Sequence, residues 1–221
     1  MKNSKPLPHA WREKKLFDQG VATIVGVDEV GKGSWAGPLV IGIAMLSRET
    51  IFSDEPAMLL GGVRDSKQLS EIRREEMFAQ VASSCLKWAT GAASALECDE
   101  LGMVEAQRLA TARGFQALGG EVDVAIVDGR WDFVSPHAKK VLVEVKADAD
   151  CVSVAAASVL AKVMRDRMMR GLADDYPQWH FDTNKGYPCP KHRAALQGYG
   201  PSAIHRKSWA FMPNYVPWLA S

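Results

Sequence analysis

An apolar run that ends in two adjacent acids and a glycine-rich turn constrains this chain more than any other stretch. Residues 21–27 predict a buried strand, and Asp28 and Glu29 follow it directly. Neighbouring side chains of a strand point to opposite faces, so both acids reach one site only if the strand ends or bends there, which Gly31 and Gly33 allow. Carboxylates bind hard divalent cations, and a lysine between glycines can meet a phosphate. The segment therefore predicts metal-dependent chemistry on a phosphodiester.

Composition sets the class of protein. A chain of 221 residues with 47% hydrophobic residues suits one domain with a substantial core, and its net charge of +1 does not by itself indicate nucleic-acid binding. No apolar run approaches the length of about eighteen residues that spans a membrane. The polar, basic first fifteen residues lack the apolar core of a secretory signal, and the four cysteines form no Cys-x-x-Cys pair. We therefore expect a cytoplasmic protein with reduced thiols, no membrane partner and no zinc site.

The order of apolar patterns predicts a mixed α/β domain. The expected strands are 21–28, 38–46, 86–95, 122–127 and 140–145, and the expected helices are 71–84, 99–118, one from 153, 191–197 and one from 201. Ser70 and Asp99 are the expected N-caps, and Asp166 and Arg170 are expected to pair on an outer helix face. We divide the chain into a solvated polar tail (1–20), a catalytic core (21–175) and a C-terminal substrate-binding extension of the same domain (176–221).

Four acids stand at or just after predicted strand ends: Asp28, Glu29, Asp128 and Asp148. The strand ends of one sheet lie side by side, so these residues can converge although they are remote in sequence. Clustered carboxylates repel one another without a cation, and oxygen-only ligands suit Mg²⁺ or Mn²⁺. Taken singly, Asp128 in Asp-Gly is more often a turn residue, and Asp148 or Asp150 could cap the helix that follows.

A basic segment near the C-terminus supplies the opposite charge. Residues 184–207 hold five lysines and arginines and no aspartate or glutamate. Such a segment beside an acidic metal site suits an anionic polymer held over the metal. An ordinary basic surface face is the alternative.

Several blocks along the chain together resemble one family. They are Asp28-Glu29 with Gly31-Lys32-Gly33, Asp65-Ser66-Lys67, Val127-Asp128-Gly129, Lys146-Ala147-Asp148, residues 155–163 with Arg165-Asp166, Asn184-Lys185-Gly186-Tyr187, and His205-Arg206-Lys207-Ser208-Trp209. In this order, over residues 21–213, they are similar to the motifs of type 2 ribonuclease H, the ribonuclease HII family.

The resemblance implies a ribonuclease H-like fold, a mixed five-stranded sheet flanked by helices, with a helical C-terminal extension. It implies two-metal catalysis with Mg²⁺ or Mn²⁺ held by Asp28, Glu29, Asp128 and Asp148, with Asp28 as the bridging ligand. It assigns recognition of the 2′-hydroxyl to Gly31, Lys32, Gly33 and Tyr187, and we expect further substrate contacts from Ser66, Lys67, Ser158, Lys185 and Arg206.

The activity that the resemblance implies is that of an endoribonuclease. The protein would cut the RNA strand of RNA–DNA hybrids and nick duplex DNA 5′ to an embedded ribonucleotide, leaving 3′-hydroxyl and 5′-phosphate ends. Its partners would be hybrids and ribonucleotide-containing duplexes, and its roles ribonucleotide excision and primer removal in DNA replication. We expect a monomer.

Some positions leave alternatives open. Lys32 stands where the family has arginine and Asn184 where it commonly has histidine, so junction selectivity is less firmly implied than the metal chemistry. Ser158 is explained equally well as a small core residue, and Arg206 as a side chain that fastens the C-terminal segment. Tyr187, taken alone, is explained as an aromatic ring that fills a crevice.

Three rival functions remain. A ribonuclease HIII sibling would carry an extra N-terminal substrate-binding domain, for which about twenty residues before the first strand leave little room. A non-catalytic hybrid-binding module would lack one of the four acids. A magnesium-dependent phosphatase of small molecules would not need the basic segment or the glycine-lysine-glycine turn.

Overall fold

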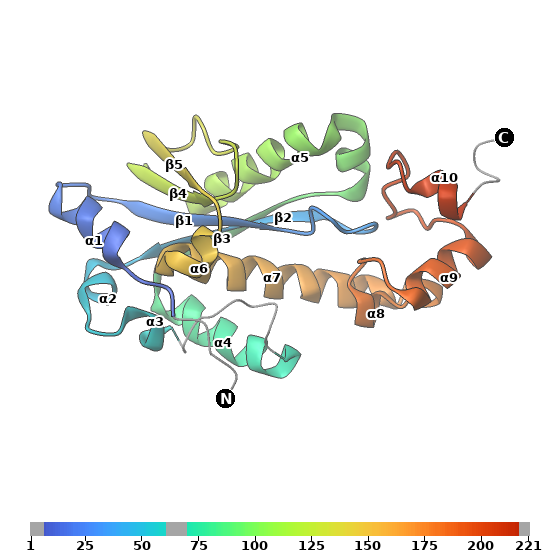
Figure 1. Ribbon diagram of the computed structural model, residues 1–221, viewed down its shortest axis with the longest axis horizontal. Coiled ribbons are helices and arrows are strands. Elements are labelled where there is room, and N and C mark those ends of the chain that lie inside the picture. Colours follow the sequence, from blue (N-terminus) through green and yellow to red (C-terminus); the bar gives the residue numbers. More distant parts are fainter. Residues whose placement is uncertain (1–6, 61–69, 217–221) are drawn as a thin grey trace.

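A five-stranded mixed sheet forms the centre of the molecule (Figure 1), seen in a computed structural model that describes residues 7–60 and 70–216. The strands are β1 (Ile24–Val30), β2 (Leu39–Leu46), β3 (Cys85–Ala93), β4 (Val124–Asp128) and β5 (Lys140–Glu144), in the spatial order β3-β2-β1-β4-β5. β1 pairs antiparallel with β2 and parallel with β4, so β1 joins the antiparallel part of the sheet to its parallel part. The predicted mixed sheet is confirmed, and each strand lies within a few residues of its expected range.

Helices cover both faces of this sheet. α5 (Ala95–Leu118) lies on one face, and α7 (Val152–Ala173) lies on the other with α4 (Glu71–Ser84) beneath it (Figure 1). Alternate residues of β1 feed two apolar clusters: Val25 and Val27 pack with the α5 side, and Ile24 packs with the α7 side. β1 is thus buried on both faces, which explains its uninterrupted apolar sequence.

Two glycines let α7 approach the sheet closely. A methyl group added at Gly26 would lie 2.1 Å from the carbonyl carbon of Ser153, and one added at Gly42 would lie 2.3 Å from the carbonyl oxygen of Ala157. Any side chain at either position would therefore displace the helix. This close packing holds the first turns of α7 directly over β1 and β2, next to the acidic end of β1.

The N-terminal residues include a packed helix. α1 (Trp11–Asp18) buries Leu16 and Phe17, so the expected solvated tail is wrong for this segment. Glu13 is also buried, and its Oε1 atom accepts hydrogen bonds from the amide and hydroxyl of Ser153 at 3.0 and 2.7 Å. Burial raises the pKa of Glu13. α1 therefore caps the N-terminus of α7 from outside the helix.

Short helices connect the larger elements. They are α2 (Arg48–Phe52), α3 (Pro56–Leu59) and α6 (Ala147–Asp150), followed near the C-terminus by the 3₁₀ turn η2 (Pro177–Trp179), α8 (Phe181–Asn184), α9 (Pro190–Tyr199) and α10 (Met212–Tyr215). α3 lies in a segment for which neither a helix nor a strand was expected, and turns replace the helix expected from residue 201 until α10 begins. α8, α9 and α10 gather at one end of the sheet (Figure 1).

One expected helix cap is correct and another is wrong. The Ser70 hydroxyl accepts a hydrogen bond from the Arg73 amide at 3.2 Å, as predicted. α5 begins four residues earlier than expected, because Ser94 and Glu97 form a capping box. Asp99 instead binds the C-terminal segment: its carboxylate accepts the Lys207 amide at 2.6 Å.

The expected surface pair of Asp166 with Arg170 is also wrong. Asp166 is only 3% exposed and pairs with Lys162 at 2.5 Å and with Arg74 of α4 at 2.9 Å. Arg170 pairs with Glu75 of α4. The pairs Asp166–Arg74 and Arg170–Glu75 join α7 to α4, and the position of α4 against α7 could not be predicted from the sequence. Among the described residues, no helix has both the length and the apolar character to cross a bilayer.

Candidate active site

Three acids meet where β1 and β4 end. Asp28 comes from β1, Asp128 from β4 and Asp148 from α6, and one carboxylate oxygen of each lies within 4.8 Å of the others. Val27 pairs in register with Val127. The next residue on each strand therefore points to the same face, the one that α7 covers. Convergence of Asp28 and Asp128 follows from this parallel register.

A hydrogen bond between a backbone amide and Asp128 fixes the position of the third acid, Asp148. The Oδ1 atom of Asp128 accepts the amide of Ala147, the first residue of α6, at 3.0 Å. Lys146, just before this helix, adopts a left-handed conformation with φ of 64°. The turn into α6 thus places Asp148 over the end of β4. Asp128 therefore positions its neighbour as well as offering its own oxygen.

Electrostatics at the three-acid cluster favour a cation. Burial, together with the charges of Asp128, Glu29 and Asp148, raises the pKa of Asp28 to about 8, against a smaller opposing effect of a hydrogen bond from Ser158. Ionising a carboxyl group with so high a pKa at neutral pH costs free energy unless a cation binds beside it. The donor set, three carboxylates with only oxygen ligands, fits a hard divalent ion.

Glu29 lies on the opposite face of β1. The strand stays regular through this residue, which pairs in register with Ile41, so the bend needed to bring both acids together is absent within β1. The Glu29 carboxylate faces α5, where it accepts a hydrogen bond from Gln107 at 3.1 Å and pairs with Lys32 at 3.3 Å. The cluster within 4.8 Å thus contains three of the four expected acids.

The glycine turn is joined to the segment that carries Tyr187. Gly31 has a φ of 88°, and its amide donates to the Tyr187 hydroxyl at 3.1 Å. The guanidinium of Arg165 lies 5.1 Å from the centre of the tyrosine ring. It also donates to the carbonyls of Pro38 and Lys185 at 2.9 and 2.8 Å. Arg165 therefore fastens both segments together.

Sequence reasoning gave Arg165 no role. It is fully buried, but it stands beside Lys162, Asp166 and Arg167 in a charged stretch of α7, so composition does not single it out. The signal that could have found it is its spacing of four residues from the apolar Ala161 and Met169, which puts it on the buried face of the helix, where a charge needs several buried acceptors.

The structure places the expected substrate-contact residues differently. Lys32 and Gly33 are exposed at the turn, and Ser158 is half-buried against Asp28. Lys185 is 6% exposed, with its ammonium directed to the Asp182 carbonyl. Ser66 and Lys67 lie outside the described residues.

Arg206 is fully buried, and this argues against the substrate contact expected of it. Its guanidinium donates to the carbonyls of Lys32 and Gly37 at 3.0 and 3.1 Å. It ties the C-terminal segment to the glycine turn, the alternative that the sequence left open. Burial lowers the pKa of Arg206 to about 10.

A buried histidine pair supports Tyr187 from behind. The Ser202 amide donates to Nδ1 of His205 at 2.9 Å, the two histidine Nε2 atoms are 2.9 Å apart, and Nδ1 of His192 lies 2.9 Å from the Tyr187 carbonyl. This series of hydrogen bonds requires a proton on Nε2 of His205 and on Nδ1 of His192, with both rings neutral. Burial lowers both pKa values, that of His205 to about 3.

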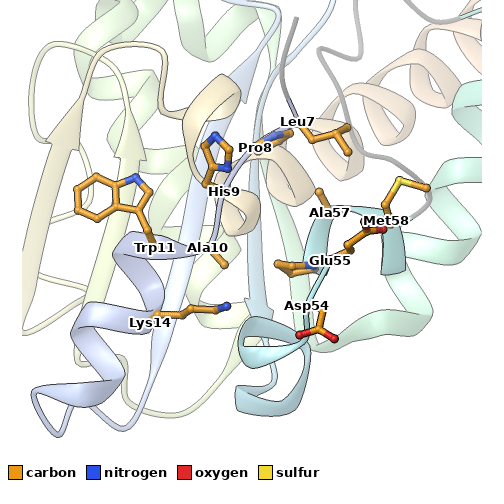
Figure 2. Close-up of a pocket in the computed structure, with 11 residues that line it drawn as sticks. Leu7, Pro8, His9, Ala10, Trp11, Lys14, Asp54, Glu55, Ala57 and Met58 are labelled. Carbon is orange, nitrogen blue, oxygen red and sulfur yellow. The ribbon is translucent and has the colours of Figure 1, made fainter.

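A separate cavity of about 410 Å³ lies on the side of the N-terminal helix. Figure 2 shows its walls, which come from residues 7–11 and Lys14 on one side and from residues 54–58 on the other. The cavity shares no residue with the three-acid cluster. It is therefore a site distinct from the acidic cluster.

A mixed five-stranded sheet with carboxylates at the ends of two neighbouring parallel strands defines a nuclease of the ribonuclease H-like class. The family model for ribonuclease HII matches residues 25–212. A ribonuclease HII of Streptomyces griseus is 41% identical over 217 residues, which are 97% of this chain and 88% of that protein. The chain belongs to the ribonuclease HII family, and it is accordingly an endoribonuclease.

Solved structures show the same likeness. The ribonuclease H2 of Pyrococcus horikoshii OT3 is similar with a TM-score of 0.74 at 28% identity, covering 90% of this chain and 100% of that one. The ribonuclease HII of Archaeoglobus fulgidus, solved in a complex with PCNA, is similar with a TM-score of 0.70 at 27% identity, covering 87% of this chain and 96% of that one. These likenesses bear out the fold and family that the sequence motifs imply.

Proposed function

We propose that this endoribonuclease cuts the RNA strand of RNA–DNA hybrids and nicks duplex DNA 5′ to an embedded ribonucleotide, with Mg²⁺ or Mn²⁺ as its cofactor. One observation carries the proposal: Asp28, Asp128 and Asp148 converge within 4.8 Å, and the strand that carries Asp28 leads directly into the exposed Lys32 and Gly33. A metal-binding cluster and a phosphate-binding turn thus share one strand end.

The three acids of the cluster would hold the divalent ions. A bound divalent ion supplies a water of lowered pKa as nucleophile and stabilises the leaving oxygen. The protein's own contribution is to fix the acids, through the strand register and the bond from Ala147 to Asp128. Glu29 adds negative charge beside Asp28 from the other face of β1. We retain it as the fourth acid of the site.

Recognition of the ribose would fall to the glycine turn and to Tyr187. A protein distinguishes RNA from DNA by the 2′-hydroxyl group, and closely approaching backbone groups can bond it. The hydrogen bond from Gly31 to Tyr187 places an aromatic ring beside this turn, where it can pack against the sugar that follows the cleavage site. Lys32 would meet a phosphate as a point charge.

Mapping the cleavage site tests this proposal. The purified protein is incubated with Mg²⁺ or Mn²⁺ and an end-labelled DNA duplex that contains one ribonucleotide, with the all-DNA duplex of the same sequence as control. We expect one nick 5′ to the ribonucleotide, with 3′-hydroxyl and 5′-phosphate ends, and an intact control. Cleavage of both duplexes, or of neither with either ion, would contradict the proposal.

A further inference from the structure

The helix that carries Asp148 is too short to hold its own position. α6 has only four residues, and a helix of that length has little stability by itself. The carboxylate of Asp128 accepts its first amide at 3.0 Å. Its other end runs through Cys151 directly into α7. The contacts made at this junction therefore contribute to where Asp148 lies.

Residues from the N-terminal part of the chain complete the first turn of α7. Cys151 is the N-cap residue, and its side chain makes no cap hydrogen bond with the described residues. The amide of Val152 donates instead to the carbonyl of His9 at 3.1 Å, and the amide of Ser153 donates to the Glu13 carboxyl group at 3.0 Å. Since amides at the start of a helix need partners from outside it, these two bonds stabilise the start of α7.

The same N-terminal residues also hold the chain on both sides of Asp148. The amide of His9 donates to the carbonyl of Asp150, the last residue of α6, at 2.9 Å. Arg12 pairs with Glu144, the last residue of β5, just before the turn into α6. The short segment that carries Asp148 is thus fastened at its beginning and at its end.

The clamp segment, residues 9–13, is itself anchored in the core. Glu13 is fully buried, and its Oε1 atom accepts the hydroxyl of Ser153 at 2.7 Å in addition to the amide. The helix that follows buries Leu16 and Phe17 in the same apolar cluster as the first residues of α7. The clamp segment therefore has a fixed place from which it can position α6.

We propose that Glu13 is a positioning residue of the metal site, which holds α6 through the first turn of α7 and so keeps the Asp148 carboxylate within reach of Asp28 and Asp128. The inference rests on the proposed function, which assigns divalent ions to these three acids. Loss of the Glu13 bonds frees the start of α7 and the end of α6 together. Asp148 then occupies its ion-binding position for a smaller fraction of the time, and the affinity for the ion falls by that fraction.

Binding of Mn²⁺ to the free protein, titrated by electron paramagnetic resonance well below the melting temperature, tests this link without substrate. Glu13→Leu removes both bonds to Ser153 and should weaken Mn²⁺ binding about fivefold, less than the loss that follows removal of a direct partner of a metal ligand. Glu97→Leu is the matched control, because Glu97 caps the start of α5 on the other face of the sheet. It should lower the melting temperature and leave Mn²⁺ binding unchanged. Equal weakening in both variants, or unchanged binding in E13L, would overturn the inference.

Rescue by Glu13→Gln separates the hydrogen bonds of this side chain from general packing. Burial raises the pKa of Glu13, so a neutral amide is a close substitute for its carboxyl group, and the amide oxygen can accept both bonds from Ser153. E13Q should bind Mn²⁺ with wild-type affinity, and a loss as large as that of E13L would count against the role of the bonds. If E13L does not fold, Ser153→Ala replaces it. S153A removes the bond of the hydroxyl alone and should weaken Mn²⁺ binding about twofold, and wild-type binding in S153A would then overturn the inference.

Cleavage of a ribonucleotide-containing duplex gives an independent reading. E13L should need about fivefold more Mn²⁺ for half-maximal cleavage, while kcat at saturating Mn²⁺ and KM for the duplex change less than twofold, because the clamp segment touches neither the substrate nor the reacting groups. A loss of kcat that excess Mn²⁺ does not restore would contradict the inference.

The two proposals fail in different ways. A wild-type protein that binds Mn²⁺ and cuts the duplex, but no more readily than E13L, contradicts only the role of Glu13. A wild-type protein that binds no Mn²⁺ and cuts no ribose-containing duplex contradicts the proposed function, whatever Glu13 does.

Discussion

The Tyr187 hydroxyl accepts a hydrogen bond from the Gly31 amide at 3.1 Å, across 156 positions of the chain. This contact joins the turn that follows β1 to the segment between α8 and α9. The guanidinium of Arg165 underlies both segments, and the His192 ring lies behind the Tyr187 carbonyl. The expected ribose-reading elements are therefore one connected structure that buried side chains support.

Tyr187→Phe should lower kcat/KM on a single-ribonucleotide duplex about fivefold, since it leaves the buried Gly31 amide without its acceptor at a cost of about 1 kcal/mol. The ring and its packing remain, so the melting temperature should change little. Tyr199→Phe removes a hydroxyl from a tyrosine that is 68% exposed and serves as the control. Equal cleavage kinetics for the two variants would contradict the role given to the hydroxyl.

Arg165→Met should destabilise the protein by about 3 to 5 kcal/mol, because several buried acceptors lose their donor together. The acceptors are the carbonyls of Pro38, Ala36 and Lys185 and the Ser34 hydroxyl.

The control for this prediction lies two residues further along α7. Arg167 pairs with Glu75 at 2.6 Å, but its side chain is 43% exposed. Arg167→Met should therefore cost about 1 kcal/mol or less. Urea unfolding of both variants measures the difference, and similar losses for the two would show that the buried arginine does not brace the turn.

Stability of the metal-free protein should fall as the pH rises. The pKa of Asp28 is about 8 in the folded state against 3.8 as its ordinary value, so the folded protein binds more protons than the unfolded chain between these limits. The free energy of unfolding should drop by up to about 2 kcal/mol between pH 6.5 and 8. His205, with its pKa lowered to about 3, acts below pH 6.5 and in the opposite direction.

Urea unfolding in EDTA at several pH values checks this slope. Asp28→Asn should flatten it, and Mg²⁺ should restore stability to the wild-type protein most strongly at pH 8, because a bound cation offsets the charge of the ionised cluster. A wild-type slope equal to that of D28N would contradict the raised pKa of Asp28.

Local patterns predicted most of the secondary structure but not the way in which elements meet. The strand of residues 21–28 and the Ser70 cap were predictable because apolar periodicity and capping act within a few residues. α1 was missed because its basic, polar sequence hides the buried Leu16 and Phe17. Asp99 resembles a cap in sequence, and only the fold shows that it binds the C-terminal segment.

The site was predictable to the extent that it depends on strand ends. Asp28 and Asp128 follow apolar runs, and parallel pairing brings such positions together. The position of Glu29 depended on whether β1 bends, which the glycines permit but do not dictate. The burial of Arg206 and the contacts of Gln107 depend on packing between remote segments, and single-sequence patterns carry no signal for these contacts.

The most direct test of the metal-binding cluster compares two acids of the same short helix. Asp148 belongs to the cluster, and Asp150, two residues further on in α6, is exposed and outside it. Binding of Mn²⁺ to the free protein is titrated by electron paramagnetic resonance for D148N, D150N and the wild type, and cleavage is measured on the same samples. We predict that D148N loses both Mn²⁺ binding and cleavage while D150N keeps both. Wild-type binding and cleavage in D148N would contradict the account.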